Sequence, residues 1–160
     1  MIDHRLLVAG LSVLLVGAGA STASLYVMNR ADEEQQQARS AISDAADDGA
    51  VAVLSYRAES VDADIEHAAS FLAGDFLNYY SAFGAESIAP AAKDRGITSS
   101  ATVSASSVVS SSEDSAVALV FVNQNITSTD APDPKAASSS LRLELNRVDG
   151  RWLISKLDPI

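Results

Sequence analysis

Side chains that can act as acids, bases or metal ligands gather between residues 56 and 80. They are Tyr56, Asp62, Asp64, His67, Asp75, Tyr79 and Tyr80, and Trp152 offers an aromatic pocket wall from a later segment. A carboxylate or an imidazole can remove a proton from a substrate, and a tyrosine can stabilise the negative charge that develops on oxygen. These groups would suit an isomerase or a dehydratase, provided that the fold brings them to one pocket.

Each candidate also has a simpler structural explanation. Asp62 and Asp75 stand where predicted helices begin, and a carboxylate there accepts hydrogen bonds from free N–H groups of the first turn. His67 follows Asp64 by three residues on a predicted helix, but two ligands do not complete a metal site. The tyrosines and Trp152 fit the aromatic part of a core. We therefore predict no catalytic, metal-binding or cofactor-binding residues and no cofactor.

Helical periodicity dominates the sequence up to about residue 95. Small and apolar residues of a first helix, predicted to begin at about Ala31, recur at steps of three and four along one stripe. They are Ala38, Ile42, Ala45, Gly49, Ala52 and Tyr56. Gly49 weakens a helix by about 1 kcal/mol relative to alanine, so it indicates a bend or a close contact.

Two further helices are predicted after the first. The second begins at Ser60 or Asp62, which can cap it, and its inward residues are Ile65, Ala68, Ala69 and Leu72. Gly74 and Asp75 then indicate a stop and a new cap, and the third helix ends near Ala89 and Pro90. Its apolar and aromatic residues are Phe76, Leu77, Tyr79, Tyr80 and Phe83.

Strand periodicity begins at about residue 96. The apolar residues Ile97, Ala101, Val103, Ala105 and Val109 alternate with threonine and serine, and residues 111–114 form a turn. Ala116 to Val122 is apolar on both faces, which predicts a central strand covered on each side. Asn123 to Ser140 is polar and contains Pro132 and Pro134, so it is interpreted as a long exposed loop.

The last hairpin is the clearest local pattern. Leu141, Leu143 and Leu145 alternate with polar residues, and Asp149-Gly150 is a two-residue turn. That turn predicts that Arg147 lies opposite Trp152 and that Leu145 lies opposite Ile154. One face of the hairpin is then a hydrophobic wall with no acid or base.

This order of elements predicts an α+β fold in which about three helices pack on a curved, four-stranded antiparallel sheet. The cone-like domain of the nuclear transport factor 2-like type fits that order. We expect one domain over residues 31–160, helical over 31–95 and sheet over 96–160.

The amino-terminal segment Leu6 to Met28 contains no charged side chain. As a helix it would cover the hydrocarbon core of a bilayer, about 30 Å thick. A secretory signal cleaved after Ala20 is the alternative, although the apolar run continues past that point. We predict a single transmembrane helix over residues 6–28, a short cytoplasmic start over 1–5, and an extracytoplasmic domain.

The charge balance excludes some partners. The chain has 21 Asp and Glu against 11 Lys and Arg, a formal net charge of −10, and no cysteine. It lacks a basic stripe that would neutralise phosphates, so we expect no nucleic-acid partner. The lack of cysteine excludes disulfides, thiolate metal sites and cysteine catalysis.

Several short segments resemble a known family. They are Leu54-Ser55-Tyr56, Val61-Asp62-Ala63-Asp64, Leu72-Ala73-Gly74-Asp75-Phe76 with Tyr79-Tyr80, Val120-Phe121-Val122-Asn123-Gln124, and Val148-Asp149-Gly150-Arg151-Trp152-Leu153-Ile154 with Leu157-Asp158-Pro159. In these segments the chain is similar to the Mce-associated membrane proteins of actinobacteria. Arg57 departs from the family pattern, because an acidic residue is common after the tyrosine.

The resemblance implies a single-pass cell-membrane protein whose extracytoplasmic domain is similar to the nuclear transport factor 2-like cone. Members accompany Mce (mammalian cell entry) complexes, which import lipids or sterols, and act as accessory or stabilising subunits. The expected partners are Mce complex proteins or other cell-envelope proteins. Two alternatives stay open: a lipid-binding or lipid-transfer module in the same system, and an isomerase-like or dehydratase-like enzyme in the cone pocket.

Overall fold

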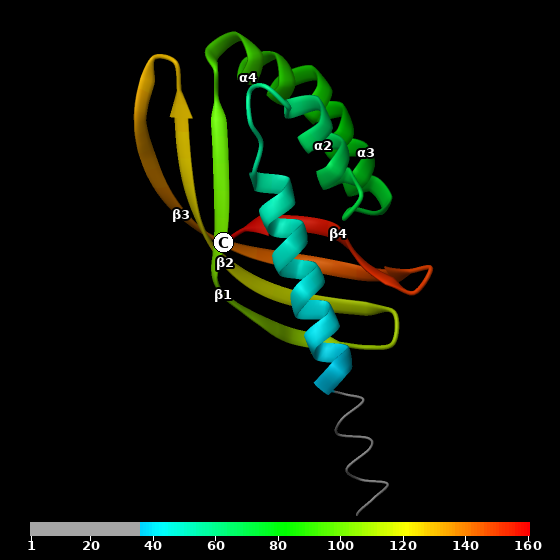
Figure 1. Ribbon diagram of the computed structural model, residues 1–160. Helices are drawn as coiled ribbons and strands as arrows, with labels where there is room; N and C mark the ends of the chain where they lie inside the picture. The colour runs from blue at the N-terminus through cyan, green and yellow to red at the C-terminus, as the bar shows by residue number, and fades with distance from the viewer. Residues whose placement is uncertain (1–35) are drawn as a thin grey trace, which may run out of the picture. The chain divides into compact units, whose positions relative to one another are not determined.

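The structure, a computed structural model, describes residues 36–160 (Figure 1). The predicted transmembrane segment Leu6 to Met28 and the cytoplasmic start lie outside the described residues. Within residues 36–160, no helix is both long enough and apolar enough to cross a bilayer. Residues Arg39–Ile160 form one compact unit, which contains the fold.

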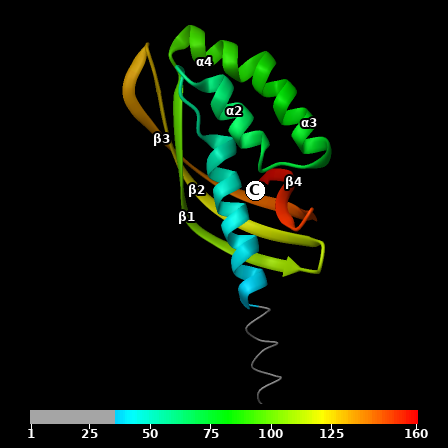
Figure 2. The same ribbon diagram turned by 45° about the vertical axis from the view of Figure 1, so that its right-hand side comes forward.

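Three helical segments precede a four-stranded antiparallel meander, which confirms the predicted α+β class. The first segment is a helix over residues 36–54. The others are α2 (Val61–Ala69) and the run of α3 (Gly74–Phe83), the π-helix η1 (Gly84–Ile88) and α4 (Ala89–Arg95). The strands are β1 (Thr98–Ser111), β2 (Ser115–Ser128), β3 (Ala131–Val148) and β4 (Arg151–Pro159), in the order β1-β2-β3-β4. The helices cover one face of this sheet (Figure 2).

The helix over residues 36–54 buries a stripe slightly rotated from the predicted one. Ile42, Ala46, Ala50 and Val53 are buried, whereas Ala38 is exposed. Gly49 is a close-contact site, because a Cβ atom there would lie 2.5 Å from Cδ1 of Ile154 on β4. The glycine therefore lets this helix lie directly against the sheet.

The predicted end of the third helix at Ala89 and Pro90 is wrong. The helix continues to Arg95, because Pro90 lies in the first turn of α4, where its missing N–H costs little. Gly96, with φ of 60°, ends the segment in the left-handed conformation. The predicted caps also differ: Asp62 and Asp75 lie within the first turns of α2 and α3 and do not cap them.

The segment Asn123 to Ser140 is not a loop, because β2 and β3 continue as a long hairpin that turns at residues 129–130. Register shifts between Ile126 and Ser128 place Pro132 and Pro134 in an irregular stretch of β3. β4 pairs with β3 only from Leu141 onward, so the prolines lie on a sheet edge. A proline is tolerated at such an edge because no partner strand needs its N–H.

Strand β1 follows the predicted alternation only in its first half. Ala101 is buried and Val103 is half-buried, as expected, but the register shifts between Val103 and Ala105 and again between Val108 and Ser110. A bulge adds a residue to one strand and turns later side chains to the other face. Ala105 and Val109 are consequently exposed, contrary to the prediction.

The last hairpin has the predicted register, with Leu145 opposite Ile154 and Arg147 opposite Trp152. Asp149 and Gly150 have φ of 50° and 79°, as a tight two-residue turn requires. The buried leucines of β3 and Ile154 face the helices and form the centre of the core.

The opposite face of the sheet carries a row of apolar residues on β2. Val117 and Leu119 are half-buried, and Phe121 is 42% exposed. Among the described residues the helices lie on the other face, so the expectation that β2 is covered on both sides is wrong (Figures 1 and 2). This outer sheet face, defined by Val117, Leu119 and Phe121 with their neighbours on β1 and β3, is available for contact.

Candidate functional site

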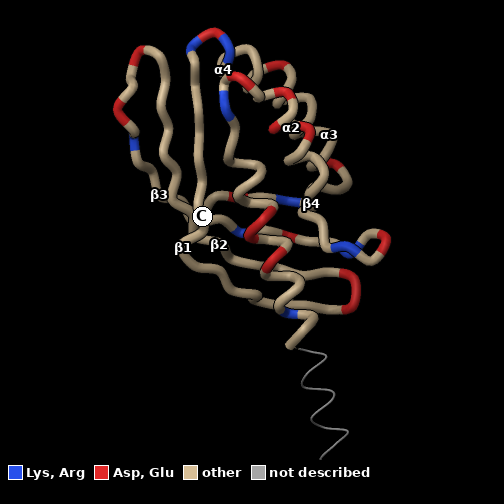
Figure 3. Tube along the Cα trace, viewed as in Figure 1, with Lys and Arg blue, Asp and Glu red and all other residues tan. Residues whose placement is uncertain are grey.

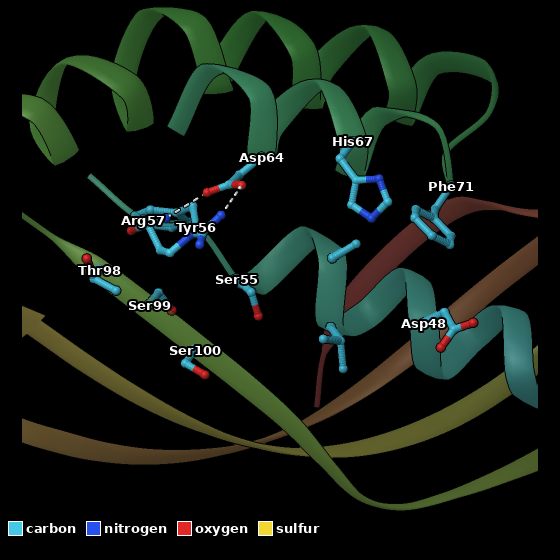
Figure 4. Close-up of a pocket in the computed structure, with 12 residues that line it drawn as sticks. Asp48, Ser55, Tyr56, Arg57, Asp64, His67, Phe71, Thr98, Ser99 and Ser100 are labelled. Carbon is cyan, nitrogen blue, oxygen red and sulfur yellow. Dashed lines mark hydrogen bonds and ion pairs between the residues drawn. The ribbon is translucent and has the colours of Figure 1, made fainter. Parts of the chain in front are cut away.

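A cavity of about 580 Å³ lies between the helix over residues 36–54, α2 and the start of β1 (Figure 4). Its lining includes three of the residues singled out in the sequence, Tyr56, Asp64 and His67. The other lining residues are Asp48, Val51, Ala52, Ser55, Arg57, Phe71, Thr98, Ser99 and Ser100. The fold therefore brings a carboxylate, an imidazole and a phenol to one place, which the sequence could only propose.

The Asp64 carboxylate is held by its neighbours. Oδ2 accepts hydrogen bonds from the backbone N–H of Arg57 at 2.9 Å and from the Ser60 hydroxyl at 2.8 Å. Oδ1 lies 3.5 Å from the Arg57 guanidinium (Figure 4). Partial burial raises the pKa of Asp64, but these bonds and the Arg57 charge outweigh that effect and hold the pKa below its usual value.

This environment suits a structural carboxylate better than a catalytic one. A general acid or base works best when its pKa lies near the working pH, and the pKa of Asp64 is shifted in the opposite direction. Its bonds tie the segment after the first helix to the first turn of α2. The carboxylate therefore fixes the connection between two helices.

The hydroxyl groups on the β1 side of the cavity join the first helix to the sheet. Ser99 Oγ donates to the Leu54 carbonyl at 2.7 Å, and Ser55 Oγ accepts the Ala101 N–H at 3.0 Å. Tyr56 and Ser99 exchange both backbone hydrogen bonds, at 2.9 and 2.8 Å. Tyr56 thus forms a short β-bridge beside β1. The hydroxyls of Ser55 and Ser99 are used to attach the end of the first helix to this strand.

The remaining side chains of the cavity do not form a metal site. The His67 ring meets the Phe71 ring edge-on, with centroids 5.2 Å apart. Within residues 36–160, no cluster of three or more His, Asp or Glu side chains could hold a metal ion. His67 is exposed, and it lies in the same cavity as Asp64 without a hydrogen bond between them in the described part of the chain.

The other candidates lie elsewhere. Asp62 forms an exposed ion pair with Lys93 at 2.6 Å, and Asp75 is exposed. Tyr79 is 63% exposed and stacks on Phe83. Trp152 is half-buried on β4 against the core.

Tyr80 is the buried tyrosine of the set. Its hydroxyl donates to the Val53 carbonyl at 3.3 Å. Burial, together with the nearby Tyr56 and Asp64, raises the pKa of Tyr80 to about 12. The hydroxyl therefore stays protonated and anchors α3 to the first helix.

Sequence reasoning missed the roles of Ser55, Ser99 and Gln124. Gln124 Nε2 donates to the Leu54 carbonyl at 3.4 Å and to Ser99 Oγ at 3.3 Å. The pattern did contain one signal, because Ser99 stands between Ile97 and Ala101 in the series that faces the helices. A polar residue in that series must find a hydrogen-bond partner.

Acidic residues recur along the first helix and along α2 (Figure 3), and Asp44, Asp48, Asp62 and Glu66 among them are exposed. Asp47 is the half-buried member, and its Oδ2 accepts a hydrogen bond from Ser106 on β1 at 2.9 Å. Burial raises the pKa of Asp47, the Ser106 bond opposes the shift, and Asp44 and Asp48 add to it. This side of the molecule is electronegative, and the cavity beside α2 contains two of its acids, Asp48 and Asp64.

Residues 5–160 match the family model described as "Uncharacterized protein Rv1363c/MT1408-like". The chain belongs to this family. Among its relatives, the uncharacterized protein Rv1362c of Mycobacterium tuberculosis is 42% identical over 153 residues, which cover 94% of this chain and 69% of the relative. The outer membrane protein Rv1973 of the same organism is 47% identical over 117 residues, or 72% of each chain.

Solved structures show that this member of the Rv1363c/MT1408-like family has a nuclear transport factor 2-like fold. An IcmL-like type IV secretion system protein from Legionella pneumophila superposes with a TM-score of 0.63 at 11% identity, over 76% of this chain and 93% of that one. An Ntf2-like protein involved in plasmid conjugation superposes with a TM-score of 0.51 at 12% identity, over 79% and 48%. At these identities the likeness concerns the fold alone.

Proposed function

We propose that the protein is a non-enzymatic, membrane-anchored accessory subunit that stabilises an Mce-type lipid or sterol import system by docking on other envelope proteins. The observation that carries this proposal is the state of the candidate chemical groups. Asp64, the carboxylate that lines the cavity together with His67 and Tyr56, is engaged by bonds from Arg57 and Ser60. The apolar row on the outer face of the sheet is left uncovered. The domain therefore has an exposed apolar surface on which a partner can dock, whereas its candidate acid is engaged in structural bonds.

Relatives and structural neighbours support an envelope setting. Rv1973 is described as an outer membrane protein, and the IcmL-like neighbour belongs to a type IV secretion system. The link to Mce complexes comes from the sequence resemblance, whereas the single-pass topology with a cytoplasmic amino terminus comes first from the uncharged segment Leu6 to Met28. These finer features are therefore part of the proposal.

The outer sheet face is the docking surface that we favour. Its apolar row is flanked by the small residues Ala105 and Ser107 on β1. On its other side, Arg142 pairs with Glu144 at 2.5 Å and Lys156 with Asp158 at 2.7 Å. An apolar strip beside internally paired charges can be covered by a partner without leaving a charge unpaired.

A pull-down tests the assignment to an Mce system. The tagged full chain is purified from detergent-solubilised membranes, and the associated proteins and lipids are identified together. We expect Mce proteins to be recovered. Recovery of other envelope proteins without any Mce component would overturn the Mce assignment while leaving the docking role intact.

Site-specific cross-linking tests the docking face. The chain has no cysteine, so a single introduced thiol can carry a photoreactive maleimide. We expect Phe121→Cys on the outer sheet face to cross-link to the partner in membranes, and Glu66→Cys on exposed α2 to give no adduct. The reverse pattern would move the docking surface to the acidic helical side.

The anchor is tested by the mass of the mature chain in the membrane fraction. The proposal expects the full-length mass, because an accessory subunit cleaved after Ala20 would lose its attachment beside the transporter. A mature chain that begins at Ser21 and leaves the membrane would contradict this part.

An isomerase-like activity is the second candidate, and the shared cavity of Tyr56, Asp64 and His67 is the observation in its favour. Proton abstraction by Asp64 would require a carboxylate released from Arg57 and Ser60. Turnover of a small ketone by the purified full chain, abolished by Asp64→Asn, would replace the non-enzymatic proposal with this one.

A further inference from the structure

A second cavity, of about 380 Å³, lies between the end of the first helix, the η1–α4 segment and strands β1 and β2. Its lining residues are Val53, Leu54, Tyr56, Phe83, Ser87, Ile88, Ala91, Ser99, Gln124 and Ile126. None of them is charged, although the chain is acidic. Three other cavities in the described part of the chain differ in this respect. The cavity beside α2 includes Asp64, one at the β1–β2 turn includes Arg142, and one near the β2–β3 turn includes Lys135.

The π-helix η1 shapes one wall of this cavity. A π-turn contains one residue more than an α-turn and is often found at functional sites. Gly84 starts η1, and a Cβ atom there would lie 2.7 Å from Cγ2 of Ile65 on α2. The back of the turn is therefore pressed against α2, and Phe83, Ser87 and Ile88 line the cavity on the other side.

Polar atoms inside the cavity are few and specific. Gln124 uses both of its donor positions on the Leu54 carbonyl and Ser99 Oγ, which leaves its carbonyl oxygen as an acceptor. The Tyr56 and Ser87 hydroxyls supply groups that can donate or accept. At the rim, Phe83 is 44% and Ile126 36% exposed, so the apolar character extends to the surface.

We propose that this cavity binds an uncharged amphiphile, a molecule with an apolar body and one hydroxyl or carbonyl group. Gln124 and Tyr56 fit that single polar group, and the apolar walls fit the body. At about 30 Å³ for each water-sized group, the volume holds about a dozen non-hydrogen atoms. The inference does not depend on the docking function, because it concerns the opposite side of the sheet.

An ionised ligand does not fit the same walls. A carboxylate or ammonium group placed there would lose its hydration and find no counter-charge among the lining residues. The contrast between a neutral and an ionised head group on the same chain is therefore the sharpest test of the proposal.

The experiment uses the full chain reconstituted in phosphatidylcholine vesicles. The probes are decan-1-ol and decanoate, each with an aliphatic diazirine in its chain, and adducts are located to residues by tandem mass spectrometry after irradiation. We expect the alcohol to label residues 83–91 and 124–126, with a yield there at least about tenfold above that of decanoate, which corresponds to about 1.4 kcal/mol.

Two exposed serines provide matched variants. Ser87→Trp fills this cavity, whereas Ser100→Trp fills the cavity beside Asp64. We expect Ser87→Trp to remove most of the labelling of residues 83–91 and 124–126, and Ser100→Trp to preserve it. Equal labelling by the two probes, or loss of labelling in both variants alike, would overturn the proposal.

A second cavity-filling variant tests the same cavity from another element. Ala91→Trp reaches it from α4, independently of the position of Ser87. We expect its labelling to fall in the same way while its circular dichroism spectrum stays unchanged. A folded Ala91→Trp chain that is labelled like the unaltered protein would contradict binding in this cavity.

Discussion

Asp64 could have either a catalytic or a structural role. Its carboxylate made it a candidate base, and its spacing of three residues from His67 suggested a shared metal; the fold does place both residues beside one cavity. The hydrogen-bond donors around it decide the matter. The donors are the Arg57 N–H and the Ser60 hydroxyl, both in the segment between the first helix and α2. The carboxylate therefore stabilises the junction of the two helices.

Asp64→Asn should lower the free energy of unfolding by about 1 kcal/mol at pH 7, because a charge-assisted acceptor of two hydrogen bonds is lost. The pKa of Asp64 is below 3.8 in the folded state, so its stabilisation is present above about pH 4. That stabilisation disappears as the pH falls through the folded-state pKa. Urea unfolding at pH 7 and at pH 2.5 measures the difference.

Asp62→Asn is the matched control, because Asp62 makes an exposed ion pair with Lys93. It should change the unfolding free energy by less than about 0.5 kcal/mol. Equal losses in the two variants would show that the Asp64 bonds have no special structural role.

Gly49 tests how closely the first helix approaches β4. Gly49→Ala should destabilise by about 1–3 kcal/mol despite the better helix propensity of alanine, because the new methyl group meets Ile154 Cδ1. Thermal unfolding checks the loss.

The double variant Gly49→Ala with Ile154→Val removes that Cδ1 atom. Its loss of stability should be smaller than the sum of the two single losses by at least about 0.5 kcal/mol. Strict additivity would mean that the contact does not limit the helix position.

At the scale of elements, a local sequence signal predicted the structure correctly where it is compatible with only one conformation. The Asp149-Gly150 turn set the register of the last hairpin, and its two positive φ values agree with that conformation. The helix end at Pro90 failed because proline is compatible with a first turn as well as with a stop. The π-helix η1 has no sequence signature of its own and could not be predicted.

The β2–β3 hairpin shows why composition misled the interpretation of residues 123–140. Serines, asparagines and prolines indicated a loop, but pairing with β1 and β3 on its two sides outweighs the low strand propensity of this part of β2. The bulges of β1 likewise depend on its partner strand. Neither feature can be inferred from one segment alone.

Hydrogen exchange distinguishes a strand from a loop here. Backbone amides of Asn123 and Asn125, which lie between β1 and β3, should exchange at least about a hundredfold more slowly than unstructured amides. The amide of Asp130 at the turn gives the internal comparison, because the Thr129 amide is itself bonded to the Arg95 carbonyl. Fast exchange at Asn123 and Asn125 would restore the loop interpretation.

At the scale of the whole molecule, the sheet has one face that holds the fold together and one that does not. The α+β order, with helices on one side of four antiparallel strands, was predictable from periodicity. The meeting of Tyr56, Asp64 and His67 was not, because it depends on how the helices cross the sheet. The uncovered outer face was also missed, since an apolar strand does not reveal which neighbours cover it.

The two faces should differ in their response to truncation. Leu143→Ala, on the buried face, should cost about 2–5 kcal/mol of unfolding free energy. Phe121→Ala, on the outer face, should cost less than about 1 kcal/mol, because the ring is already partly in water. Chemical denaturation of both variants checks the contrast, and similar losses would mean that the outer face is part of the core.

The edge of β3 has a consequence for the behaviour of the protein at high concentration. Open sheet edges recruit strands from neighbouring molecules, which is the first step toward fibres. Pro132 and Pro134 offer no N–H to an approaching strand, and the Tyr56–Ser99 bridge occupies part of the edge at β1. The same prolines that made this stretch look like a loop therefore protect the hairpin from aggregation by strand addition.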